Sequence, residues 1–167
     1  MKCLLIKILK YSLDDIYQYD AVNINDDVSE WNICARLAMY IEKRMRFYDF
    51  FNRTEIFKNY YVDVEYNRSY NAKPKIVDGK HVRCDLLIHS RESTKPNYLV
   101  LELKKSYNND IEDDINEIKR MVSPREEGAA DFYNCGTLLG VFLEFKQSSY
   151  NGTIYSWEND RIKEEML

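Results

Sequence analysis

The chain has 167 residues, of which 45% are hydrophobic and 31% charged, and its formal net charge is −4. This length and balance predict one folded domain over residues 1–167 and exclude an intrinsically disordered chain. The negative charge argues against a protein that coats nucleic acid non-specifically, because such binding depends on neutralising phosphates, but it allows an enzyme with a local basic cleft and acidic metal ligands.

Several functional classes lack their sequence signatures. No apolar run is long enough to cross a bilayer and the N-terminus carries no signal-peptide cleavage pattern, so we expect a cytoplasmic protein without a membrane partner. There is no Walker loop, no G-x-G-x-x-G and no G-x-S-x-G motif. The four cysteines form no C-x-x-C pair, so we expect neither a zinc site nor a disulfide framework. We expect His81 and His89 at the surface.

The first third of the chain is predicted to be mostly helical. Residues 1–20 form a helix or a strand followed by a helical turn, and a strong helix covers residues 28–48, with capping side chains at residues 26–29. Its apolar stripe consists of Cys34, Leu37, Ala38, Ile41 and Met45. Glu30 falls on this core-facing stripe, which is unusual for a carboxylate. The pattern is equally compatible with a solvated Glu30 that favours the positive end of the helix dipole.

Three strand patterns follow. Residues 60–66 alternate apolar and acidic side chains, which is typical of a half-buried strand, and residues 67–80 form a polar excursion with a turn. Residues 83–89 form a second strand that carries Asp85 near its beginning. A short polar connection then leads, as in a hairpin, to a third strand over residues 98–105.

The third strand contains the feature on which the functional prediction depends. It begins with four apolar residues, which indicates burial on both faces. Glu102 and Lys104 then share one face, while Leu99, Leu101 and Leu103 point to the other. A buried carboxylate and ammonium cost several kcal/mol, roughly, unless a partner compensates them. A metal ion in a water-filled cleft would compensate both.

The last third predicts a crossover connection. A helix covers residues 111–122, with its acidic side chains first and its basic ones last, as the helix dipole prefers. A hydrophobic strand follows at residues 137–145, then a short strand at residues 153–157 and a charged terminal helix. The order helix, strand, strand, strand, helix, strand predicts an α/β fold in which helices flank a mixed sheet in three layers.

The predicted hairpin places Asp85 beside Glu102 and Lys104. Adjacent strands lie about 4.8 Å apart, so the two carboxylates could share one cation. Oxygen ligands of this kind suit Mg²⁺ or Mn²⁺, which also accept a phosphate oxygen. Lys104 could orient or help to deprotonate an attacking water, or it could neutralise charge on a five-coordinate phosphorus.

These residues resemble the PD-(D/E)XK nuclease superfamily, which has the restriction-endonuclease-like fold. Asp85 is followed after 16 residues by Glu102, Leu103 and Lys104, the E-x-K element. The element lies in the expected hairpin and precedes the expected helix. The resemblance covers a core of about residues 28–145, in the order α-β-β-β-α-β.

The resemblance extends to small bacterial-type members of the superfamily. Glu30 is similar to their helix glutamate, residues 64–68 to the strand before the catalytic hairpin, and residues 140–143 to a later core strand. Cys84 departs from the family pattern, which often has proline at this position. This position does not ligate metal in the family.

The resemblance implies a nuclease that uses Mg²⁺ or Mn²⁺ and acts on nucleic acid, with DNA as the expected polymer. Asp85 and Glu102 would bind the metal together with the backbone carbonyl of Leu103. Glu30 would hold the metal through water or hold a second metal, and Lys104 would position the nucleophilic water.

Other residues near the expected cleft have weaker roles. Glu65 would be an additional acidic neighbour, and Lys105 would point away from the site and be structural. Five side chains are candidates for phosphate contacts, each equally compatible with an ordinary solvated charge. They are Asn67, Arg68, Lys73, Lys75 and Arg83.

Two alternatives stay open. The same fold could serve as a catalytically inactive module that binds nucleic acid or dimerises, since function does not follow from fold alone. The charged residues could also form a structural ion-pair network. Convergence of Glu30, Asp85, Glu102 and Lys104 on one solvent-reachable pocket would favour the enzyme. Side chains that diverge, or a cleft filled by packing, would exclude the nuclease. The chain has no recognisable target-recognition domain, so a homodimer or another protein could supply specificity.

Overall fold

A computed structural model describes residues 1–25, 28–66, 76–77, 80–81, 83–91, 95–105, 111–124 and 137–167. The helices are α1 (Lys2–Tyr19), α2 (Ala21–Asn25), α3 (Glu30–Asn52) and α4 (Glu112–Val122). The strands are β1 (Tyr61–Tyr66), β2 (Ile76–Val77), β3 (Lys80–His81), β4 (Cys84–His89), β5 (Leu99–Lys105), β6 (Leu139–Phe145), β7 (Tyr150–Glu158) and β8 (Arg161–Met166). No helix within these ranges is both long and apolar enough to span a membrane.

Six strands form one mixed sheet in the order β1-β4-β5-β6-β7-β8, and β2 and β3 pair separately. All neighbours in the large sheet are antiparallel except β5 and β6, which run parallel. Parallel neighbours need a crossover connection, and α4 lies in the chain between them. The predicted mixed sheet with flanking helices is therefore confirmed.

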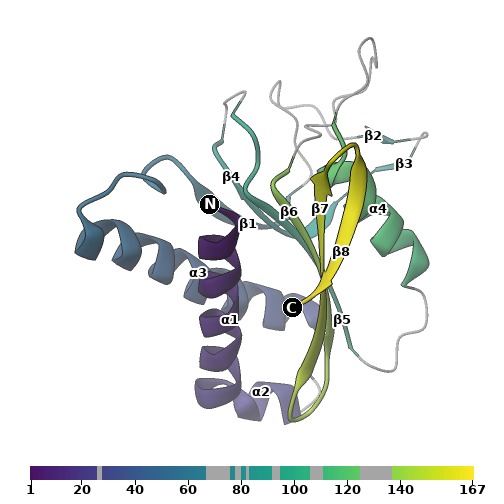
Figure 1. The fold of residues 1–167 in the computed structure, drawn as a ribbon. Helices are drawn as coiled ribbons and strands as arrows, with labels where there is room; N and C mark the ends of the chain where they lie inside the picture. Colours follow the sequence, from purple (N-terminus) through teal and green to yellow (C-terminus); the bar gives the residue numbers. More distant parts are fainter. Residues whose placement is uncertain are drawn as a thin grey trace.

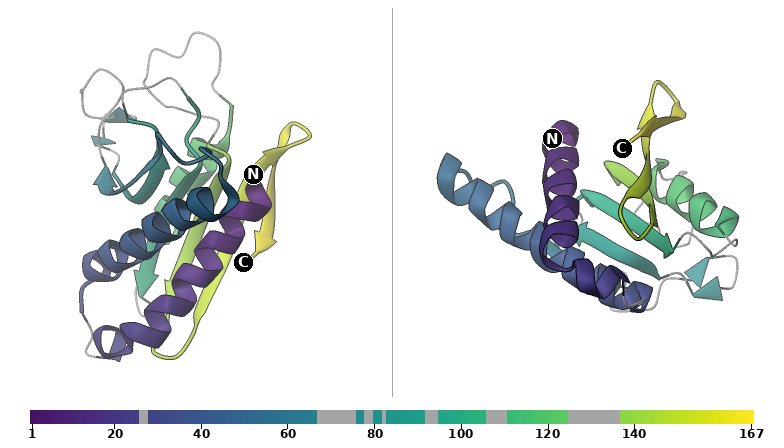
Figure 2. Two further views of the ribbon diagram at one scale, coloured as in Figure 1. Left: turned by 90° about the vertical axis from the view of Figure 1, so that its left-hand side faces the viewer. Right: turned by 90° about the horizontal axis from the view of Figure 1, so that it is seen from below.

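Helices cover both faces of the sheet. Figure 1 shows α1 and α3 on one side and α4 on the other, and Figure 2 shows the same layers from two further directions. The side chains of β5 alternate between two cores. Leu99, Leu101 and Leu103 pack with the α1 and α3 core, whereas Val100 packs with Ile118 of α4. Glu102 follows in the same alternation and therefore faces α4.

The sequence explains why α3 begins and ends where it does. The Ser29 side chain accepts a hydrogen bond from the Asn32 N–H at 3.3 Å and caps the first turn. At the other end, Arg53 adopts φ 53°, a left-handed conformation that stops a helix. The Asp49 carboxylate then accepts the N–H groups of Ile56 and Phe57. The helix is one turn longer than predicted because these signals lie beyond residue 48.

The end of the chain differs from the prediction. The expected terminal helix is wrong, because residues 161–166 form the edge strand β8, paired with β7. Asn159 and Asp160 both have positive φ, 51° and 60°, which is the turn that joins two antiparallel strands tightly. The alternating charges of β8 are mostly exposed, as suits a sheet edge. The short strand predicted at residues 153–157 is the centre of the longer β7.

Gly140 sets how closely α4 packs on the sheet. A Cβ atom at this position would overlap Ile118 Cγ2 and lie 3.0 Å from Val122 Cγ1. We expect Gly140→Ala to lower the free energy of unfolding by about 1–3 kcal/mol, the usual cost of overpacking a core. Thermal unfolding checks this. Because Ile118→Ala removes the overlapping methyl, the double variant should lose less stability than the sum of the two single variants. Additive losses would contradict the close contact.

Candidate active site

The site lies where β4 and β5 cease to pair. Their regular pairing ends at Leu86 and Leu101, and the next pair in register would be Asp85 and Glu102. Beyond this point the Leu103 N–H donates to Asp85 Oδ2 at 2.8 Å. The end of the ladder therefore puts two carboxyl groups opposite each other, as the hairpin prediction required.

Burial and neighbouring charges alter the acidity of Asp85. Burial raises the pKa of this carboxyl above its usual range, although the Leu103 N–H and the Lys104 ammonium oppose the rise. The hydrogen bond from Glu102 also lowers this pKa, and the negative charge of Glu30 raises it. The pKa of Asp85 therefore reflects opposing effects, some of which stabilise its charged form and some of which destabilise it.

Glu102 is the more perturbed acid. Its side chain is 5% exposed, and burial raises its pKa well above the usual value. The charges of Asp85, Glu117 and Asp114 raise it further, and so does the hydrogen bond with Asp85. Glu102 Oε1 is buried and has no hydrogen-bond partner within the described residues. Two carboxyl groups in such contact cannot both be charged unless a cation compensates them, so without one the pair shares a proton.

Glu30 approaches from the opposite layer. It lies in the first turn of α3, and its Oε1 accepts the Lys105 N–H at 2.9 Å, so helix and strand are joined at the end of β5. Cys34, one turn later, is buried, and burial raises the pKa of its thiol. Four carboxylates raise that pKa further, so the charges of all four act on this thiol. They are Asp85, Glu102, Glu30 and Glu65.

Lys104 forms an ion pair with a carboxylate of α4. Its ammonium is 3.1 Å from Asp114 Oδ2, on α4. Burial lowers the pKa of Lys104, but the ion pair with Asp114 and the charges of Glu30 and Asp85 outweigh this effect and raise it. Lys104 is therefore a permanent cation at neutral pH, which can donate hydrogen bonds but cannot accept a proton.

Glu65 has a strained backbone beside these acids. Its φ is 52°, a left-handed conformation that costs a non-glycine residue about 1–2 kcal/mol. The β1–β4 pairing is interrupted at this residue, opposite Asp85, between the Val64 and Tyr66 pairs. Its carboxylate forms an ion pair with Arg83 at 3.3 Å. Such strain is commonly found at functional sites.

The structure also contains interactions that the sequence analysis missed. Asp114 and Glu117 of α4 act on Lys104 and Glu102. The expectation of a surface His89 is wrong, because this side chain is buried and its Nε2 lies 2.8 Å from Asp63 Oδ2. Arg91 pairs with the same carboxylate. Alternate residues of a strand share one face. This alternation could have predicted that Asp63 lies on the face of Glu65 in β1, and that His89 lies on the face of Asp85 in β4.

The remaining predicted residues divide into two groups. Lys105 is buried, and its backbone N–H contacts Glu30. Arg83 is exposed and paired with Glu65. The other candidate phosphate contacts, and the side chain of His81, lie outside the described residues. These contacts are Asn67, Arg68, Lys73 and Lys75.

The donor set can be compared with the needs of a divalent cation. Among the described residues, no three or more His, Cys, Asp or Glu side chains are arranged as a ready-made metal site. Mg²⁺ commonly binds through only one or two carboxylates and keeps several waters until a substrate phosphate replaces them. The Asp85 and Glu102 pair fits this requirement, since Glu102 Oε1 has no hydrogen-bond partner in the described part of the chain.

Comparisons of the chain with protein-family models, curated proteins and solved structures give no match. The functional argument therefore depends on the geometry and electrostatics of the chain's own residues.

Proposed function

We propose that this chain is a metal-dependent nuclease that hydrolyses phosphodiester bonds of nucleic acid, with DNA as the expected polymer. One observation carries the proposal: the partly buried Asp85 and the buried Glu102 share a hydrogen bond at the end of a strand ladder, and Glu102 Oε1 has no hydrogen-bond partner among the residues that the structure describes. Perturbed acids of this kind are concentrated at functional sites. The restriction-endonuclease-like core is part of the same proposal.

Asp85 and Glu102 would hold Mg²⁺ or Mn²⁺ in place of their shared proton. The Leu103 carbonyl would be a further ligand, and Glu30 would act through water. When bound, the cation would supply a Lewis acid that activates water and polarises a phosphoryl oxygen. The Leu103 N–H keeps the Asp85 carboxylate in one orientation, since it already donates to Oδ2.

Lys104 has a defined role in this proposal. Because its pKa is raised, it acts as an ammonium that orients the attacking water and stabilises charge on phosphorus, and it is not the base. Asp114 would be a positioning residue, since it holds the ammonium from α4.

This role predicts different effects for two variants. Lys104→Met should lower kcat by about 10²–10³-fold, as for loss of one group that stabilises transition-state charge. Asp114→Asn should lower kcat less. It should also move the alkaline limb of the pH profile to lower pH, because Lys104 loses the partner that raises its pKa.

The pH profile of kcat with a plasmid substrate measures both effects. Asp113→Asn is the matched control, because Asp113 is the exposed neighbour in the same turn of α4. Asp114→Glu should restore most of the wild-type profile. Equal profiles for Asp113→Asn and Asp114→Asn would show that Asp114 does not position Lys104.

One observation favours a second candidate function, a nuclease-fold module that binds nucleic acid without cleaving it. The Lys104 ammonium is engaged with Asp114 instead of with the Asp85 and Glu102 pair. If the protein binds a DNA duplex and the duplex stays uncut after prolonged incubation with Mg²⁺ or Mn²⁺, this candidate is supported over the nuclease.

A further inference from the structure

The outward face of α3 carries a row of large apolar side chains. Four of these side chains are apolar, and one lysine lies in the same row. The row has a four-residue spacing, with Phe50 beside it, and we call these five residues the α3 stripe: Met39, Lys43, Phe47, Phe50 and Phe51. Phe50 and Phe51 are each 76% exposed. Their ring centroids lie 5.2 Å apart, and those of Phe47 and Phe51 6.1 Å apart, so the rings form one continuous cluster.

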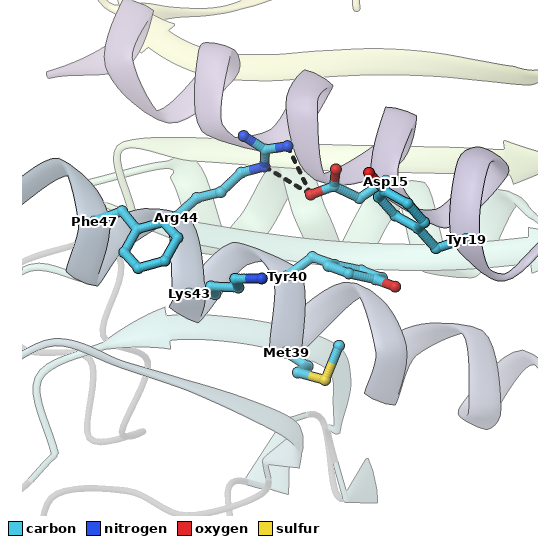
Figure 3. Close-up of a pocket in the computed structure, with 7 residues that line it drawn as sticks. All are labelled: Asp15, Tyr19, Met39, Tyr40, Lys43, Arg44 and Phe47. Atoms are coloured by element: carbon cyan, nitrogen blue, oxygen red, sulfur yellow. Dashed lines mark hydrogen bonds and ion pairs between the residues drawn. The ribbon is translucent and has the colours of Figure 1, made fainter.

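A groove continues the stripe toward α1. It has a volume of about 470 Å³ and is shown in Figure 3. Its lining residues are Asp15, Tyr19, Met39, Tyr40, Lys43, Arg44 and Phe47. Arg44 is neutralised by Asp15 at 2.6 Å, so the floor of the groove carries little net charge. The Lys43 ammonium lies 5.7 Å from the centroid of the Phe47 ring.

The exposed apolar area is large for a monomer. If a large side chain contributes about 200 Å², the exposed fractions of Tyr19 and the four apolar stripe residues amount to on the order of 600 Å². The largest apolar patch on a typical monomer is about 300–600 Å², and a standard interface buries about 800 Å² per partner. The stripe and groove together approach the area that a stable dimer needs.

We propose that a second copy of this chain binds to this surface, with its α3 antiparallel to the first. The four-residue spacing of the stripe is self-complementary about an axis near residue 45. In that arrangement Phe51 of each copy reaches Met39 and the groove of the other, and Phe47 meets Lys43. Each lysine then lies against an aromatic ring of the other copy and not against the other lysine. α3 extends beyond α1 in Figure 2, so its last turns are accessible for this contact.

This surface is separate from the acids. Phe50 lies twenty residues beyond Glu30, or about 30 Å along the helix at 1.5 Å per residue. The dimer can therefore be tested independently of the proposed nuclease activity. It leaves the Asp85 and Glu102 site of each copy uncovered.

Light scattering after size exclusion, at about 10–100 μM protein, tests the proposal. We expect twice the chain mass for the wild type, and an increase in the dimer Kd of at least about 10-fold for Phe47→Ser/Phe51→Ser, since central aromatic residues dominate interfaces. Trp31→Ser is the matched control, because Trp31 is an exposed aromatic residue in the first turn of α3, about 12 Å along the helix from Met39, the first residue of the stripe. A wild-type monomer, or a dimer that the double variant leaves unchanged, would overturn the proposal.

A disulfide cross-link directly tests which residues of the two antiparallel α3 helices lie opposite each other. In a background of Cys3→Ser and Cys135→Ser, the variant Met39→Cys/Phe51→Cys should form a covalent dimer under mild oxidation. These positions are about 18 Å apart within one helix, too far for a disulfide inside one chain. Trp31→Cys in the same background is the control and should form no covalent dimer. Failure of the double variant to cross-link faster than this control would exclude the proposed arrangement.

Discussion

Glu102→Gln is expected to abolish metal-dependent cleavage and, at neutral pH, to make the protein more stable. Loss of the ligand should lower the cleavage rate by at least about 10²–10³-fold, as for removal of a group that stabilises transition-state charge. The gain in stability has a separate cause. Glu102 is buried among Asp85, Asp114 and Glu117, and glutamine fills the same space without the charge that these neighbours disfavour.

The stability effect has a defined pH dependence. The folded state binds the Glu102 proton more tightly than the unfolded state, because burial raises its pKa well above the unfolded value of about 4.3. The wild type should therefore lose stability as the pH rises from about 4.3 through the raised pKa, and the variant should lack this loss. The difference grows with pH and reaches about 1–3 kcal/mol, the cost of an uncompensated buried polar group.

Melting temperatures between pH 4 and 8, without divalent cations, measure this effect. At neutral pH the variant should melt higher by on the order of 2–12 °C, since 1 kcal/mol shifts a chain of this size by about 2–4 °C. Glu112→Gln, an exposed glutamate of α4, is the control and should follow the wild type. A variant that melts at or below the wild-type temperature at every pH would show that the Glu102 charge does not destabilise the folded protein.

Asp85→Asn is expected to remove the response of the protein to Mg²⁺ while leaving the fold intact. The asparagine Oδ1 can still accept the Leu103 N–H, so the end of β5 keeps its hydrogen bond. The cation, however, loses one of its two charged ligands. For the wild type, Mg²⁺ should stabilise the folded state by about 2.7 kcal/mol at 100 times its Kd.

Melting curves at increasing MgCl₂ concentration compare the two proteins. The wild-type shift should grow with pH, because the cation must displace the proton that the raised pKa values of Asp85 and Glu102 retain. Asp14→Asn, which removes an exposed carboxylate from α1, is the control and should keep the full shift. If Asp85→Asn responds to Mg²⁺ as the wild type does, the cation binds elsewhere.

The parts of the site that could be predicted are those set by local pattern. The break from apolar to charged residues in β5 identified Glu102 and Lys104, because period-two alternation assigns each side chain to a face. Helical periodicity placed Glu30 on the inner stripe of α3, and the structure shows it contacting the end of β5. In each case the informative signal was a charge at a position where the pattern requires an apolar residue.

The parts that could not be predicted depend on contacts between elements far apart in the chain. The acids at the start of α4 satisfy the helix dipole, and this local explanation hides the ion pair that joins Asp114 of the helix to Lys104 of β5. His89 is buried because Asp63 on the neighbouring strand compensates it. The charges of residues 161–166 suggested a helix, but the turn at Asn159 and Asp160 returns the chain along β7.

The most direct test of the account is digestion of supercoiled plasmid, linear duplex, single-stranded DNA and RNA by the wild type, Asp85→Asn and Glu102→Gln. Each reaction contains Mg²⁺, Mn²⁺ or a chelator. The account predicts that the wild type cuts at least one polymer, DNA first, only when a cation is present, and that both variants are inactive. Cleavage that persists in both variants, or a wild type that cuts none of the four polymers with either cation, would contradict it.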